Sequence, residues 1–357
     1  MTGYNGSSPP AYQGLLEKMG LGAHLQDYCK LHDHMVIKIG GEIAEHPGRR
    51  RAFVEDVYIL ADNGVRVQIV HGGKNAISAA MEEAGVEYDI TKGRRDTPFE
   101  GLNPTERVTN PPVTRALRDI NCRIVEDLDG HGLSVVSFDG VGDGRALYAR
   151  QPPAYRTNGN FIGYPVGFRE GVKKLIDASQ VAVISPVSQD MDSLETSISL
   201  NVNADDAACA VSKETLARRL LYLSDVEGIK FASRDASGRI LSDEAGGMLY
   251  EVVRRPTSGE VMNRILDSIA SVKDGKAPEI GGGMIPKLEC ALEALAYGAG
   301  VGGVSMVDGR VEHAVLRETL GDGCGSIMLE HIPVDAYLGW LQRVNPEKHE
   351  HLTASSL

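Results

Sequence analysis

The chain has 357 residues, of which 42% are hydrophobic and 5% aromatic, and its formal net charge is −12 at pH 7. That length allows one large domain or two lobes with a well-buried core. The acidic balance argues against broad binding to nucleic acid or to an anionic membrane, because both need concentrated positive charge.

The expected elements follow one another as alternating strands and helices. We expect Met1–Ala11 to be disordered, Tyr12–Lys30 to form an amphipathic helix and Pro346–Leu357 to be a polar tail. The expected strands are Met35–Ile39, Val65–Val70, Leu133–Phe138, Val181–Ile184, Leu220–Leu223 and Val304–Val307. The expected helices are Ala52–Asn63, Asn75–Ala84, Val113–Leu128, Glu170–Ala178, Asp205–Ala217 and Ile285–Ala296. This alternation predicts an α/β fold with a mostly parallel central sheet and helices on both faces.

Three glycine-rich turns stand at the ends of apolar runs or at the start of helical patterns. They are Gly40-Gly41, Gly72-Gly73 and Gly281-Gly282-Gly283, and they are accompanied by Lys38, Lys74 and Lys287. Such turns place backbone N–H groups where phosphate or carboxylate oxygens can bind, at the carboxyl ends of parallel strands. Each turn alone is more often a plain tight turn beside a surface lysine. Together they favour phosphoryl transfer, although none of them is a P-loop.

The middle of the chain contains two further polar motifs. Ser197–Asn203 alternates as an extended segment and Ala204 begins a helical pattern, so Asp205 and Asp206 fall at a helix N-terminus. Spacing alone favours capping for these carboxylates, and the functional alternative is that one of them holds two lysines. Ser224–Ile229 is a polar turn after a strand, which suits the base and ribose of a nucleotide but is more often a plain turn.

The cysteine pattern indicates a reducing compartment. The five cysteines are scattered, without a CxxC pair or a Cys/His cluster, so we expect free thiols and no zinc site. The sequence has no apolar run of about 18 residues, and Met1–Pro10 lacks the order of a signal peptide. We therefore expect a cytoplasmic protein.

The order of the motifs is more specific than any one of them. Along the chain they read KxGG (38–41), HGG (71–73), GRRDT (93–97), NVNAD (201–205), SDVEGI (224–229) and GGGMIPK (281–287). This order resembles the amino acid kinase family, most closely the acetylglutamate kinases, from about Met35 to Met328. The resemblance implies a three-layer αβα sandwich of the carbamate kinase-like type. It also implies ATP-dependent phosphorylation of the side-chain carboxylate of N-acetyl-L-glutamate to an acyl phosphate, as in arginine biosynthesis.

The resemblance assigns roles to individual residues. Lys38 and Lys287 are expected to bind the transferring phosphoryl group, and Asp205 to hold both lysines in place. The acceptor-binding positions are Gly72, Gly73, Lys74, Arg95 and Asn201, where Gly72 and Gly73 offer N–H donors and Arg95 binds the α-carboxylate. The ATP-binding positions are Gly40, Gly41, Ser224, Asp225, Val226, Glu227, Gly228, Ile229, Gly282, Gly283 and Met284. Mg²⁺ is expected to arrive with ATP and to take no ligand from the protein.

The resemblance also implies an organisation into segments. Residues 1–33 form an N-terminal extension and helix, 34–199 an acceptor lobe, 200–333 a nucleotide-binding lobe and 334–357 a C-terminal tail. Leu15–His34 resembles the N-terminal helix of arginine-inhibited hexameric members. That likeness implies a homo-oligomer, a dimer or a hexamer, and an arginine effector.

The departures from the family pattern lie on the acceptor side. Lys74 stands where the family has the third glycine of HGGG, Arg94 and Asp96 change the next loop, and the segment 244–281 is expanded. We expect Pro111-Pro112 to interrupt the helix that covers the substrate. A different small acid, such as an N-acyl aminoadipate, another modified amino acid or a phosphonate-like molecule, is therefore the alternative acceptor. A catalytically silent sensor is disfavoured, because the two lysines and the aspartate of the transfer step are all present.

Overall fold

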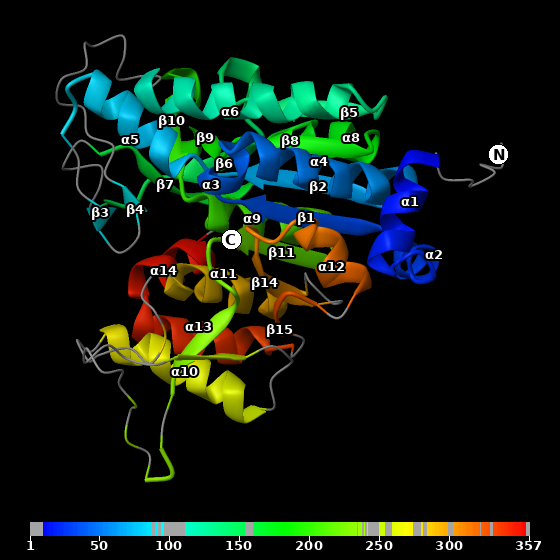
Figure 1. Ribbon diagram of the computed structural model, residues 1–357. Helices are drawn as coiled ribbons and strands as arrows, with labels where there is room; N and C mark the ends of the chain where they lie inside the picture. Colours follow the sequence, from blue (N-terminus) through cyan, green and yellow to red (C-terminus); the bar gives the residue numbers. More distant parts are fainter. Residues whose placement is uncertain are drawn as a thin grey trace.

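The computed structural model shows how the elements are arranged (Figure 1). It describes residues 10–87, 90–91, 94–95, 111–153, 160–196, 198–233, 235–237, 239, 241, 250–253, 259–273, 280, 284–298, 303–321, 323–328 and 331–354. Within these ranges, no helix has the length and apolar character needed to cross a membrane.

A seven-stranded sheet forms the middle layer, in the order β15-β14-β11-β1-β2-β8-β5. Its strands are β1 (His34–Ile39), β2 (Arg66–His71), β5 (Val135–Phe138), β8 (Val181–Ile184), β11 (Arg219–Ser224), β14 (Val304–Asp308) and β15 (Gly325–Met328). Every neighbouring pair is parallel except β14 and β15, which are antiparallel. The mostly parallel sheet is confirmed, and each expected strand is present with its ends shifted by a residue or two at most.

Helices cover both faces of this sheet (Figure 1). One face carries α1 (Pro10–Met19), α2 (Leu25–Leu31), α4 (Pro47–Asp62), α6 (Pro111–Asp129) and α12 (Ala314–Leu320). The other carries α8 (Val172–Asp177), α9 (Ala204–Thr215), α10 (Gly259–Lys273), α11 (Ile285–Ala296), α13 (Val334–Val344) and α14 (Pro346–Ala354). Strand β1 explains the two layers, since Val36 packs into one buried cluster and its neighbours Met35 and Ile37 into the other. The three-layer αβα architecture is thereby confirmed.

A second β structure lies beside the main sheet. Strands β6 (Leu147–Arg150), β7 (Ile162–Phe168), β9 (Val187–Asp190) and β10 (Ser199–Val202) close into a barrel. Only the extended segment at Ser197–Asn203 had been expected, because short strands whose partners lie far away in sequence leave weak local patterns. The last strand, β10, leads directly into α9.

The remaining elements are short or lie at the edges. They are α3 (Gly41–Ala44), α5 (Lys74–Glu83), the β3–β4 hairpin (Ile90–Thr91, Arg94–Arg95), the β12–β13 pair (Ile229–Ala232, Tyr250–Val253) and the 3₁₀ turns Gly142–Gly144 and Met191–Thr196.

Three expectations about helices were wrong. Tyr12–Lys30 is two helices, because α1 ends at Gly20 in a left-handed conformation (φ +72°) with Leu21 N–H bonded to the Leu16 carbonyl at 2.8 Å. Pro111-Pro112 does not interrupt α6 but begins it, as proline can in a first turn, where its missing N–H has no helical partner.

The C-terminal segment was expected to be a polar tail and instead forms α13 and α14. Trp340 and Leu341 of α13 are buried, and so are Lys348 and Leu352 of α14. The polar composition of 346–357 concealed this packing, because a lysine that finds carboxylate partners can be buried.

Candidate active site

The site forms where three adjacent strands end. β11, β1 and β2 are neighbours in the sheet, so the turns after them meet at one edge, as ligand sites of parallel sheets do. A cavity of about 450 Å³ opens there. The predicted residues that line it are Lys38, Gly40, Gly41, Gly72, Gly73, Lys74, Asn201, Asp205, Ser224, Asp225 and Lys287.

The two glycine turns after β1 and β2 pack backbone against backbone. A Cβ atom on Gly41 would lie 3.1 Å from the Lys74 backbone nitrogen, and one on Gly73 would lie 2.7 Å from a methyl carbon of Ile120. Side chains at either position would push α5 or α6 away from the sheet edge. The Gly72 N–H donates to the Ile39 carbonyl at 2.8 Å. That N–H group is therefore used within the fold, and the role of Gly72 in acceptor binding stays a prediction.

Three charged side chains meet at the floor of the cavity, and we call them the site cluster: Lys38, Lys287 and Asp205. Lys38 Nζ lies 2.8 Å from Asp205 Oδ1, and Lys287 Nζ lies 3.3 Å from Asp205 Oδ2. Lys38 and Asp205 are buried, while Lys287 is a little more open. One carboxylate therefore holds two ammonium groups that belong to different parts of the chain.

The protonation states in the site cluster follow from burial and from these ion pairs. Burial alone would raise the pKa of Asp205, but the two lysines and their hydrogen bonds lower it to about 2. Burial lowers the pKa of Lys38, helped by the charge of Lys287 and opposed by Asp205. Asp205 is thus ionised at neutral pH and forms ion pairs with both lysines.

The start of α9 holds Asp205 in this position. Asn203 caps the helix, its Oδ1 accepting from the Asp205 N–H at 2.8 Å, and the Tyr222 hydroxyl donates to the Asp205 carbonyl at 3.4 Å. Capping, which spacing alone had favoured for Asp205, is therefore done by Asn203. The Asp205 side chain is left to bind the lysines.

Cations and an amide line the part of the cavity near β10 and α5. Asn201 lies on β10 and Lys74 is the first residue of α5. Arg49 and Arg310 also line the cavity and had been given no role. A polar turn directly after a strand was a usable signal for Arg310, whereas Arg49 lies inside α4, where nothing local distinguishes it. Arg95 belongs to β4, and its side chain lies outside the described residues.

The turn at Ser224–Ile229 is anchored to β15. Gly228 has φ +134°, and a Cβ there would lie 2.5 Å from Ser326 Oγ, which also accepts from the Ile229 N–H at 2.8 Å. Ser224 and Asp225 face the cavity, while Ile229 is buried behind them and Val226 packs against the core. Glu227 forms an exposed pair with Lys230. Gly282 and Gly283 lie outside the described residues, and Met284 is buried where α11 begins.

His71, at the end of β2, takes no part in the cavity. It is fully buried, Asn121 Nδ2 lies 3.3 Å from its Nε2, and burial lowers the pKa of His71 to about 4. It is therefore neutral at pH 7. Across the residues that the structure describes, no group of three or more His, Cys, Asp or Glu side chains is arranged to hold a metal ion.

The arrangement suits a transferring anion. In the site cluster two ammonium groups share one carboxylate, which leaves positive charge facing a cavity whose walls are glycine turns. Fixed cations in a partly desolvated site stabilise negative charge on phosphoryl oxygens.

Comparisons with known proteins agree with this geometry. Residues 33–301 match the profile of the Amino acid kinase family. The acetylglutamate kinase of Methanothrix thermoacetophila is 32% identical over 305 residues, which cover 84% of this chain and 92% of that protein.

Solved structures share the fold. N-acetylglutamate synthase from Neisseria gonorrhoeae, complexed with coenzyme A and either N-acetyl-glutamate or L-arginine, gives TM-scores of 0.61 and 0.59 at 16% identity. The two alignments cover 88% and 87% of this chain and 64% and 65% of that one. Carbamate kinase from Giardia lamblia bound to AMP-PNP gives a TM-score of 0.54 at 15% identity, covering 84% of this chain and 99% of that one.

Proposed function

We propose, since the chain belongs to the amino acid kinase family, that it transfers the γ-phosphoryl group of ATP to the side-chain carboxylate of N-acetyl-L-glutamate. The observation that carries the proposal is the site cluster, in which Asp205 holds Lys38 and Lys287 at the edge of a cavity. The similarity to an acetylglutamate kinase over most of both chains supports the acceptor.

In the proposed reaction a carboxylate oxygen attacks the γ-phosphorus, the bond to the β,γ-bridging oxygen breaks, and the products are an acyl phosphate and ADP. No general base is needed, because the acceptor carboxylate is already ionised at neutral pH. Lys38 and Lys287 approach from different elements, β1 and α11, and offset the negative charge that shifts from the γ-phosphoryl oxygens to the leaving ADP. We propose that ATP enters as its Mg²⁺ complex, in which the metal offsets phosphate charge.

The two substrates are proposed to enter the cavity from its two sides. Asn201, Lys74 and Gly73 lie on the side of β10 and α5 and are assigned to the acceptor, together with Arg95. The turn that begins at Ser224 is assigned to ATP, together with the glycine turns after β1 and before α11 (Gly40, Gly41, Gly282 and Gly283). The division into an acceptor lobe at 34–199 and a nucleotide lobe at 200–333 stays a prediction.

The direct test is turnover. Purified protein is incubated with Mg·ATP and one acid at a time: N-acetylglutamate, free glutamate, N-acetylaminoadipate and a phosphonate. ADP release and acyl phosphate trapped with hydroxylamine are measured together. Both signals with N-acetylglutamate alone would support the proposal. Turnover of a different acid would establish the alternative acceptor, with Lys74 as the first residue to examine, and silence with every acid would contradict a kinase acting on these acceptors.

We further propose an arginine effector, a homo-oligomer, either a dimer or a hexamer, and a cytoplasmic location. The synthase that shares this fold was solved with L-arginine, which supports the proposed effector. The five cysteines, all within the described residues, are free thiols, as in proteins of a reducing compartment. Turnover with added L-arginine and sedimentation with and without residues 1–30 would test the first two points. Fractionation of the source cells would test the third.

A further inference from the structure

The first turn of α9 carries two successive buried carboxylates with different partners. Asp205 belongs to the site cluster, whereas Asp206 pairs with Lys348 Nζ at 3.1 Å and accepts from Cys290 Sγ at 3.3 Å. Lys348 also lies 2.7 Å from Glu293 Oε2, and Glu293 pairs in turn with Lys213. We call Asp206, Glu293, Lys213 and Lys348 the brace network.

The brace network joins three helices. Asp206 and Lys213 belong to α9, Glu293 to α11 and Lys348 to α14. Lys348 is 3% exposed, so its ammonium group has left water and depends on these carboxylates. Burial disfavours its charge, but the neighbouring groups, Glu293 and Asp206 among them, raise the pKa of Lys348 well above its usual range. One ammonium group therefore bridges α9 and α11.

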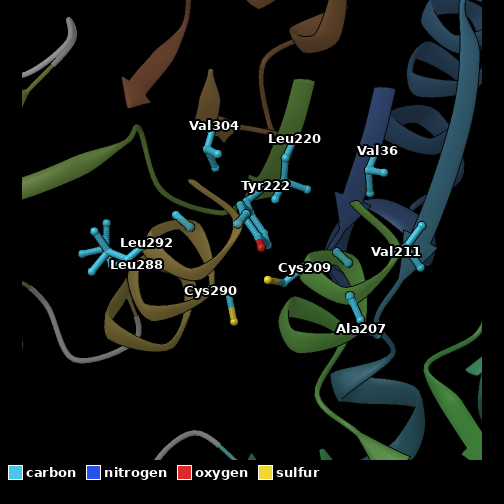
Figure 2. Packing of buried hydrophobic residues seen from close by; sticks show 14 of the residues in the cluster. Val36, Ala207, Cys209, Val211, Leu220, Tyr222, Leu288, Cys290, Leu292 and Val304 are labelled. Carbon is cyan, nitrogen blue, oxygen red and sulfur yellow. The ribbon is translucent and has the colours of Figure 1, made fainter. Parts of the chain in front are cut away.

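These two helices also hold the site cluster together. α9 carries Asp205 in its first turn, α11 carries Lys287 near its start, and the pair between them spans 3.3 Å. Figure 2 shows Cys209 of α9 and Cys290 of α11 turned towards the space between the helices, below the Tyr222 ring. Burial raises the pKa of both thiols, so they fill this space as neutral groups. The brace network thus adds further charged contacts between these two helices.

The helix that supplies Lys348 is itself fixed to another part of the fold. His351, one turn further along α14, has Nε2 3.0 Å from the Pro165 carbonyl, and its ring lies 5.3 Å from that of Tyr164. Both partners belong to β7 of the barrel, whose neighbour β10 carries Asn201. Leu352 packs into the main core. The position of Lys348 is therefore set by contacts of α14 with β7 and with the core.

We propose that Lys348 is a positioning residue for phosphoryl transfer, which bridges α9 and α11 and so sets the separation of Asp205 and Lys287. The inference rests on the proposed kinase function. Lys348 belongs to α14, which lies beyond the residues 33–301 matched by the family profile. Lys348 touches no substrate in this scheme. It acts through the two helices, and small displacements of reacting groups reduce rates strongly, by up to about 100-fold for 1 Å.

The experiment compares three variants of the full chain. Lys348→Met should lower kcat about 10-fold or more, with the KM values for ATP and for the acceptor changed less than about 3-fold, because the substrates still bind but the cluster is displaced. Lys348→Arg keeps the charge and should recover part of kcat. The double variant Asp206→Asn/Lys348→Met removes both charges and should recover the thermal stability that Lys348→Met loses, while kcat stays low.

That double variant decides between positioning and simple stability. If it regains both thermal stability and wild-type kcat, Lys348 serves stability alone and the proposal is overturned. Asp56→Asn is the matched control, since Asp56 is a fully buried carboxylate that accepts from His313 and the Val315 N–H, away from α9 and α11. It should lower the melting temperature and leave kcat within about 2-fold. A loss of kcat as large as that of Lys348→Met would contradict the proposal.

A second readout keeps the inference separate from the proposed function. Wild-type turnover is measured first, and its absence contradicts the kinase proposal alone. Amide hydrogen exchange at the start of α9 is then compared between wild type and the double variant. Faster exchange at Asp205 and its neighbours supports the brace, and unchanged exchange overturns it.

Discussion

Two lysine–carboxylate groups meet at the start of α9, one at Asp205 and the other at Asp206, and they differ in charge balance. In the site cluster two lysines share one aspartate beside a cavity of about 450 Å³. In the brace network two buried carboxylates meet two lysines, of which Lys348 is buried and Lys213 is partly exposed. The site cluster therefore carries excess positive charge beside the cavity, where an anionic ligand can balance it. In the brace network the carboxylates of the protein balance the lysines.

The largest expected effect follows from removing a lysine from the site cluster. Lys38→Ala or Lys287→Ala should lower kcat about 1,000-fold, equivalent to about 4 kcal/mol, because each lysine opposes charge that develops in the transition state. Thermal stability should change little, since the remaining lysine still pairs with Asp205. Coupled-enzyme assays of ADP release measure the first effect and melting curves the second. Near-normal turnover in both variants would contradict the site assignment.

Asp205 and Glu293 are each shared by two lysines. Their replacement should affect stability in the opposite order to the effect on turnover, with the larger loss of stability at Glu293. Glu293→Gln takes a carboxylate partner from the buried Lys348 and the partly exposed Lys213, and should reduce the free energy of unfolding by about 3 kcal/mol. Asp205→Asn should reduce it by only about 1 kcal/mol, because its lysines border the cavity and can be solvated. Urea unfolding of the two variants measures the difference. Equal losses would mean that the cavity gives the site cluster no such relief.

The pH dependence of the free energy of unfolding tests the charge of Asp205. Asp205 has a pKa lowered to about 2, against an ordinary 3.8, so its contribution to stability is complete above about pH 4 and is lost as the pH falls towards 2. The pKa of Glu293 is lowered in the same direction: burial would raise it, but Lys213 and Lys348 outweigh burial. The difference between the unfolding free energies at pH 5 and pH 3 should therefore be smaller in Asp205→Asn than in wild type, by about 1 kcal/mol. An unaltered difference would show that Asp205 is not the titrating group.

The smallest expected effect concerns the cavity wall. Lys74→Ala should raise the KM for N-acetylglutamate about 5-fold, equivalent to about 1 kcal/mol, because a cation beside an anionic acceptor is lost, and kcat should change less than about 2-fold. Steady-state kinetics with varied acceptor measure both. An improved KM would indicate that Lys74 hinders this acceptor, and the assay panel would then be repeated with other acids.

Much of the site could be predicted from the sequence, because its residues stand beside strong local signals. Lys38 ends a buried run, Gly72-Gly73 ends the next, and the helix Ile285–Ala296 has the predicted bounds. Asp205 was the harder case, since its spacing fits a helix cap, and only the hydrogen bond from its own N–H to Asn203 shows which residue caps α9.

The alternation of elements, the mostly parallel sheet and the motifs that contain Lys38, Lys287 and Asp205 could all be predicted from the sequence. These features depend on period, turn residues and short-range spacing, which are written locally in the chain. Three features could be seen only in the tertiary structure. The Gly72 N–H donates to the Ile39 carbonyl, Pro111 begins a helix, and Lys348 is buried against Asp206. Those outcomes depend on partners far away in sequence, and the free energy of burying a polar group is set by the partner it meets.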